Sequence, residues 1–130
     1  KNNCELYLLR NISRKGTGFF EAGNFYPDFI LWILCGGRQY ISFVDPHGLR
    51  HEGPASEKIK LHSRIKDIEK RLNDPAAVLN SFILSWTKYP ELNWGLNKDE
   101  LEKQHVLFMN DDKSNYINKI FDLIDLKFHL

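Results

Sequence analysis

Two aspartates flank a pair of short apolar runs in the first third of the chain. Asp28 precedes the run at residues 29–34, and Asp45 follows a second run at residues 40–44. If the two runs pair as antiparallel strands joined by a tight turn, both carboxylates lie at the same end of the pair. Mg²⁺ takes oxygen ligands and is usually held by one or two carboxylates together with substrate phosphate. The spacing therefore predicts a divalent-metal site, and the alternative is that each aspartate, next to a proline, only caps a turn.

The strands that would position these acids are recognisable from their composition. Both runs are rich in Ile, Val, Phe, Trp and Tyr and are separated by Gly36-Gly37, which is typical of a hairpin. Because both runs are almost continuously apolar, we expect strands that are buried on both faces. Residues 4–9 predict an additional strand that ends at Arg10. Most of the first 50 residues should therefore form an antiparallel sheet.

The pattern changes from strand to helix after Gly48. Ser56 is a suitable N-cap, Glu57 adds an acid to the first turn, and a helical apolar stripe then continues to Leu72. Asn73-Asp74-Pro75 should end this helix. Strands follow at residues 78–86 and 105–109, and a final helix is predicted at residues 117–124, whereas residues 98–103 leave open whether a short helix forms. This order predicts an α/β fold (an α+β mixed sheet) with one central sheet flanked by helices.

Composition excludes several classes of function. The chain has 130 residues, enough for a single domain over residues 1–130, and its 42% hydrophobic content argues against disorder. No window approaches the roughly 18 uncharged apolar residues that a membrane span needs. The net charge of +1 means that any nucleic-acid surface must be local. Glycine-rich nucleotide loops and CxxC pairs are absent from the sequence, so we expect neither a membrane partner nor a small-molecule organic cofactor.

The two cysteines carry no metal-binding spacing. Cys4 and Cys35 both lie in apolar surroundings, with no histidine or cysteine at ligand spacing. We therefore predict two unpaired, buried thiols in a reducing compartment, which corresponds to a cytoplasmic protein.

A longer stretch around the two aspartates resembles a known nuclease family. Pro27-Asp28, the following apolar strand and Asp45-Pro46-His47 are similar to the PD-(D/E)XK signature of restriction-endonuclease-like nucleases. More narrowly, residues 16–49 resemble the nuclease domain on the C-terminal side of DEAD/DEAH-box helicases related to type III restriction enzymes. The predicted order of strands and helices over the remaining residues agrees with this resemblance.

The resemblance implies a restriction-endonuclease-like sheet and a metal-dependent DNA endonuclease that uses Mg²⁺ or Mn²⁺. It implies that Asp28 and Asp45 are metal ligands and that a helicase domain precedes this domain in a longer parent chain. The sequence departs from the motif at its third residue, where His47 occupies the lysine position. Histidine has an ordinary pKa of about 6.5, so it does not supply a permanent cation at neutral pH. His47 is compatible with a base, a third metal ligand or a loss of catalysis.

Two other residues are candidates to complete the site. Lys58, at the start of the predicted helix, would replace the motif lysine from a neighbouring element, unless it is only a solvated helix residue. Glu21 would add an oxygen ligand for the metal, unless it is a loop acid. Two functions of other classes remain as alternatives: a catalytically degenerate DNA-binding or docking module, and a purely structural domain.

Aromatic residues occur both inside the apolar runs and around a polar stretch. Trp32 lies inside an apolar run and is predicted to belong to the core. Trp86, Tyr89 and Trp94 surround a polar stretch, where an aromatic ring either packs on a neighbouring domain or stacks on an unpaired base. Packing is the interpretation we favour for these three.

Overall fold

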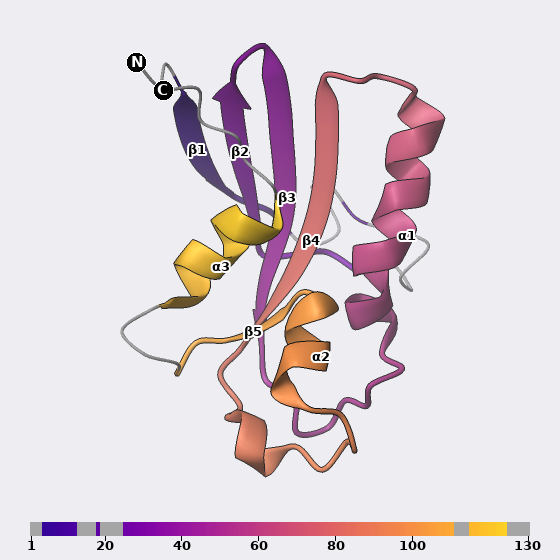
Figure 1. Ribbon diagram of the computed structural model, residues 1–130, viewed down its shortest axis with the longest axis vertical. Helices are drawn as coiled ribbons and strands as arrows, with labels where there is room; N and C mark the ends of the chain where they lie inside the picture. Colours follow the sequence, from indigo (N-terminus) through magenta and orange to yellow (C-terminus); the bar gives the residue numbers. More distant parts are fainter. Residues whose placement is uncertain (1–3, 13–17, 19–24, 111–114, 125–130) are drawn as a thin grey trace.

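The chain forms a five-stranded mixed sheet flanked by helices (Figure 1). The computed structural model describes residues 4–12, 18, 25–110 and 115–124. The strands are β1 (Glu5–Arg10), β2 (Phe29–Cys35), β3 (Arg38–His47), β4 (Ala77–Ser85) and β5 (Val106–Phe108), which lie in that order in the sheet. The helices are α1 (Glu57–Leu72), η2 (Tyr89–Glu91, a 3-10 turn), α2 (Lys98–Lys103) and α3 (Asn115–Leu123). The predicted α/β architecture with a mixed central sheet is confirmed.

The first three strands are antiparallel, and the hairpin between β2 and β3 has the predicted turn. Gly36 and Gly37 both have positive φ, at 60° and 78°, as a two-residue hairpin turn requires. The register pairs Cys35 with Arg38 at the turn and Phe29 with Val44 at the far end. Asp28 and Asp45 therefore lie side by side at the open end of the hairpin, as predicted.

Helix α1 crosses from β3 to the parallel strand β4, and its bounds follow from its caps. The Ser56 hydroxyl accepts a hydrogen bond from the Lys58 amide at the N-terminus. Asn73 ends the helix in the left-handed conformation, and its amide donates to the Lys70 carbonyl. The predicted start and end of this helix are confirmed. Local capping groups therefore determine where helix α1, which carries Lys58, begins and ends.

The later elements agree with the sequence in type. The segment at 98–103 that the apolar pattern left open is a helix, because Asn97 and Glu100 form a reciprocal capping box. Strand β5 is shorter than the predicted 105–109, because His105 has a positive φ of 63°. Strand β4 continues the sheet parallel to β3 and is buried almost throughout.

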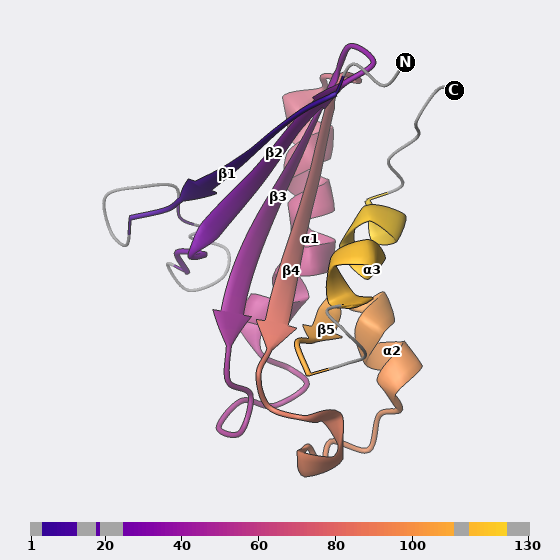
Figure 2. The ribbon, with the colours of Figure 1, turned by 90° about the vertical axis from the view of Figure 1, so that its left-hand side faces the viewer.

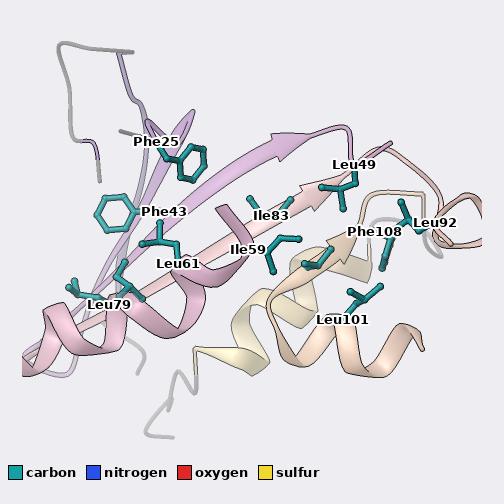
Figure 3. Packing of buried hydrophobic residues seen from close by; sticks show 12 residues of the cluster. Phe25, Phe43, Leu49, Ile59, Leu61, Leu79, Ile83, Leu92, Leu101 and Phe108 are labelled. Atoms are coloured by element: carbon teal, nitrogen blue, oxygen red, sulfur yellow. The ribbon is translucent and has the colours of Figure 1, made fainter. Parts of the chain in front are cut away.

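Two apolar clusters lie on opposite faces of the sheet, since residues that alternate along β3 and β4 fall into different clusters. Helices α1 and α2 contribute to the larger cluster, which Figure 3 draws, and α3 contributes to the smaller one. In Figure 2, α1 passes behind the strands and α3 lies beside them. The larger cluster joins Phe43 and Ile83 of the sheet to Ile59 and Leu61 of α1. Asp45 and His47 follow Phe43 at intervals of two residues, so they face α1. The packing of α1 thus places its first turn against the two acid-bearing strand ends.

The first two strands are less buried than the sequence predicted. All six residues of β1 are exposed, and six of the seven in β2 are only half-buried, including Trp32. The expectation of strands buried on both faces is therefore right for much of β3 and wrong for β2. Apolar composition alone did not distinguish them, because the helices cover β3 to β5 and leave the β1 side of the sheet partly open.

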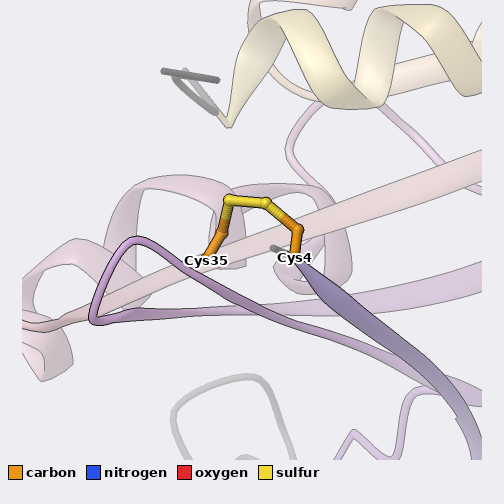
Figure 4. Close-up of a disulfide and its surroundings, with 2 residues drawn as sticks. All are labelled: Cys4 and Cys35. Atoms are coloured by element: carbon orange, nitrogen blue, oxygen red, sulfur yellow. A yellow bond between two sulfur atoms is a disulfide. The ribbon is translucent and has the colours of Figure 1, made fainter. Parts of the chain in front are cut away.

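The prediction of two unpaired, buried thiols was wrong. Cys4 and Cys35 form a disulfide, and both residues are half-buried (Figure 4). The register of β1 on β2 pairs Glu5 with Leu34, which brings the preceding residue Cys4 opposite Cys35 with 4.4 Å between their Cα atoms. The pairing arises from the register of β1 on β2, which cannot be deduced from the local sequence around each cysteine.

In the described part of the chain no helix is long and apolar enough to span a membrane.

Candidate active site

The open end of the β2–β3 hairpin gathers charged side chains from four separate segments. Asp28 comes just before β2, and Asp45 and His47 lie at the end of β3. Glu52 belongs to the loop that follows, and Lys58 is the second residue of α1. Three of the predicted site residues thus converge on Asp45, because strand alternation points His47 to the same face and α1 begins above it.

Asp45 is the most buried of these charged groups, with 5% of its surface exposed. Its Oδ1 accepts a hydrogen bond of 2.9 Å from the backbone amide of Asp28. The pKa of Asp45 is raised to about 6, mainly by burial and to a smaller extent by the negative charge of Asp28, while the hydrogen bond from the Asp28 amide and the charges of His47 and Lys58 limit the rise. A buried carboxylate beside a second acid is stabilised by an added cation.

His47 links the buried acid to the surrounding loop. Its Nδ1 lies 3.9 Å from Oδ2 of Asp45, and its Nε2 lies 3.3 Å from Oε2 of Glu52. The same Nε2 lies 3.4 Å from Nζ of Lys58. When Nε2 carries a proton it can donate to Glu52, and when it does not it can accept from Lys58. The histidine is therefore held between an acceptor and a donor, an arrangement suited to taking up and releasing a proton.

Lys58 contacts the site as the sequence predicted, and it is not a fully solvated helix residue. Its ammonium lies 3.4 Å from His47 and 5.5 Å from the centre of the Phe25 ring. A cation in the first turn of a helix opposes the helix dipole, so the helix itself does not favour this position. The neighbouring acids Asp45 and Glu52 supply the compensating charge, and both feel the charge of Lys58.

Glu52 is a site residue that the sequence analysis missed. Although burial raises its pKa, hydrogen bonds with Ser56 and His47 and the charge of Lys58 hold the pKa of Glu52 below its ordinary value. Glu52 therefore remains ionised and orients the His47 ring through Nε2. The sequence contains no motif that indicates this acid, because Glu52 lies in an irregular loop. The loop comes close to β3 only in the folded structure.

Of the three residues that the sequence predicts as metal ligands, the structure describes Asp28 and Asp45. Glu21, the third predicted ligand, lies outside the described residues. Among the residues that the structure describes, no group of three or more His, Cys, Asp or Glu side chains is arranged to hold a metal ion. Two adjacent carboxylates, one of them buried with a raised pKa, are nevertheless a donor set that fits Mg²⁺ or Mn²⁺, because these ions keep several waters and bind substrate phosphate as well.

A groove of about 640 Å³ adjoins the charged cluster. Its lining includes His47, Arg50, His51, Glu52, Trp86 and Lys88. Tyr89 and Trp94 pack against the larger apolar cluster of this chain itself, and not on a neighbouring domain as the sequence suggested. Trp86 does not pack against this cluster, since 58% of its surface is exposed. The packing of Trp86 on a neighbouring domain stays a prediction, and within this chain the residue borders the groove.

Comparisons of this chain with family models, with curated proteins and with solved structures found no match.

Proposed function

We propose that this chain is a metal-dependent DNA endonuclease domain of the PD-(D/E)XK type, part of a helicase–nuclease protein. One observation carries the proposal: the Lys58 ammonium reaches the Asp45–His47 pair from a different element. A lysine next to two acids at a strand end is the constellation that the motif requires, and here the cation comes from α1 instead of β3. The resemblance of residues 16–49 to helicase-associated nucleases supports the same assignment.

The proposed roles follow from charge and position. Hydrolysis of a phosphodiester builds negative charge on the phosphoryl oxygens and on the attacking water, so cations positioned there lower the barrier. Lys58 supplies a permanent positive charge, and His47, oriented by Glu52, accepts a proton from the water. Asp28 and Asp45 would hold Mg²⁺ or Mn²⁺, which when bound acidifies water and neutralises the phosphate.

Cleavage of supercoiled plasmid in Mg²⁺ or Mn²⁺ tests the proposal. We expect Asp45→Ala to abolish cutting and Lys58→Met to slow it by roughly 10²–10³-fold, the usual effect of removing one charge-stabilising donor. Lys60→Met is the matched control, because Lys60 lies on the same helix, is exposed and forms an ion pair with Glu57, which is not one of the residues of the candidate site. This control should cut like the wild type.

A rescue variant tests the displacement of the lysine directly. The double variant Lys58→Met, His47→Lys returns the cation to the motif position on β3, and we expect it to recover part of the activity lost in Lys58→Met. Equal loss in Lys58→Met and Lys60→Met would contradict a specific role for Lys58.

The degenerate docking module is the second candidate, because the motif lysine is replaced at His47. DNA binding that persists in a chelator, with a salt dependence set by Lys and Arg contacts and no cutting by any variant, would support it.

A further inference from the structure

Trp86 occupies a position that packing does not explain. It is the first residue after β4, and because the register pairs His47 with Ser85, Trp86 lies beside Gly48 at the end of the parallel β3–β4 pair. Its indole ring is tilted by 43° to the His47 ring, with 6.5 Å between the ring centres. The most exposed tryptophan of the described residues thus lies next to the candidate base.

The backbone around Trp86 holds the ring in one place. A Cβ on Gly48 would lie 2.6 Å from Nε1 of Trp86, so the indole rests directly on the glycine backbone. Asn110 donates a hydrogen bond of 2.9 Å to the Trp86 carbonyl. On the following residue, Thr87 Oγ1 accepts from the Leu49 amide. The indole therefore contacts the chain at Gly48 while more than half of the residue's surface stays exposed, which fits a platform for stacking.

Charges of both signs line the groove, where the cations Arg50 and Lys88 lie among the acids Glu52 and Glu91. Lys88 is exposed at the groove, and Arg50 lies at the same rim in an ion pair with Glu91. Lys58 faces the inner end of the site. A base on Trp86 would bring the adjoining phosphate into the groove that Arg50 and Lys88 also line. An aromatic side chain can cover the face of a base only where that face is unstacked, which is the case for single strands and frayed ends and not for the interior of a duplex.

We propose that Trp86 is a base-stacking platform and that the groove beside His47 binds single-stranded DNA, so that the enzyme cuts unpaired or frayed strands in preference to intact duplex. This inference rests on the proposed nuclease function and names its substrate class. The groove therefore adds specificity to the chemistry of the neighbouring acids.

Tryptophan fluorescence of the full chain tests the proposal, with Asp45→Asn present to prevent cutting. Titration with oligodeoxythymidine in Mg²⁺ should quench the fluorescence. Trp86→Ala should weaken binding by about tenfold or more, in line with one lost base stack. Trp86→Phe, which keeps an aromatic face, should bind nearly as well but without the quenching. Trp94→Phe, the matched control in the core, should retain both binding and quenching.

The outcomes separate the stacking proposal from the nuclease proposal. Cutting assays on chains that retain Asp45 supply the second readout. Quenching that depends on Trp86 without any cutting would overturn the nuclease function and leave the platform. If the protein cuts DNA but Trp86→Ala binds and cleaves single strands like the wild type, the stacking proposal alone is overturned. Absence of quenching by any strand, or equal preference for duplex, would also overturn it.

Discussion

At the scale of single residues, the ionised carboxylate of Asp45 lowers the stability of the folded protein. The folded chain buries its carboxyl group beside Asp28 and raises its pKa from 3.8 to about 6. Because the folded state binds this proton more tightly than the unfolded state, Asp45 contributes most stability when protonated. That contribution is lost as the pH rises from about 4 through 6. A residue that costs stability at neutral pH is typical of a functional site.

Asp45→Asn should therefore stabilise the metal-free protein at pH 8. A shift of about two pKa units corresponds to roughly 3 kcal/mol, and the amide oxygen can still accept from the Asp28 amide. We expect the gain, measured by urea unfolding in a chelator, to be about 1–3 kcal/mol at pH 8 and to disappear near pH 4. Asp67→Asn, an exposed change on α1, should show no such trend. A less stable Asp45→Asn at pH 8 would refute the argument.

At the scale of elements, the free edge of β4 is covered by side chains. Strand β5 pairs only with residues 83–85, so no strand of the described residues lies beside the first half of β4 on that side. Glu69 of α1 accepts a hydrogen bond from the Leu79 amide, and Nδ1 of His105 lies 2.9 Å from the Ser81 carbonyl. These side chains continue the ladder where the strand ends, and they block pairing with another chain.

His105 should make stability depend on acid. Its ring stacks on Phe82, and burial lowers its pKa to about 4, with a smaller lowering by the charges of His62 and Lys66. The folded state therefore binds the proton less tightly than the unfolded state, with its ordinary value of 6.5. The stability contributed by neutral His105 is present above pH 6.5 and falls between 6.5 and 4, by up to roughly 3 kcal/mol.

Replacement of His105 should flatten this part of the pH profile. His105→Asn is suitable, because asparagine tolerates the positive φ of this position. In thermal unfolding between pH 4 and 8 we expect a variant that is less stable at pH 8 but declines less on acidification. His51→Asn, an exposed control, should keep the wild-type slope. Unchanged slopes in both variants would rule out His105 as the source.

The same elements show what sequence reasoning can reach. The bounds of α1 and the end at which Asp28 and Asp45 meet were predictable, because caps, turns and apolar periods are local signals. Glu52 was not, because its loop carries no periodicity and returns to His47 only through packing. Lys58 was predictable as a candidate because α1 must begin near the end of β3, yet its contact with His47 depends on three-dimensional packing. The sequence thus located the acids better than their partners.

At the scale of the whole molecule, the disulfide and the candidate site lie at opposite ends of the hairpin. Cys35 is at the turn, and Asp28 is seven residues away along β2, which is roughly 20 Å in an extended strand. Disulfides persist in oxidising surroundings, whereas in a reducing compartment the same pair would be thiols. The cytoplasmic location and the helicase partner stay predictions, and the contribution of this bond to stability can be measured independently of both.

Removal of the disulfide should weaken the fold without changing the site. The bond closes a loop with a sequence separation of 31, for which the loss of chain entropy predicts roughly 3–4 kcal/mol. We expect the Cys4→Ser, Cys35→Ser variant to unfold at lower urea concentration by this amount, and the wild type in reductant to match it. Below its unfolding transition the variant should bind oligodeoxythymidine like the oxidised protein, because β3 and α1, which hold Asp45 and Lys58, are tied together by the larger apolar cluster. Weaker binding by a variant that is still folded would mean instead that the position of β2, and with it Asp28, depends on the bond at the far end of the hairpin.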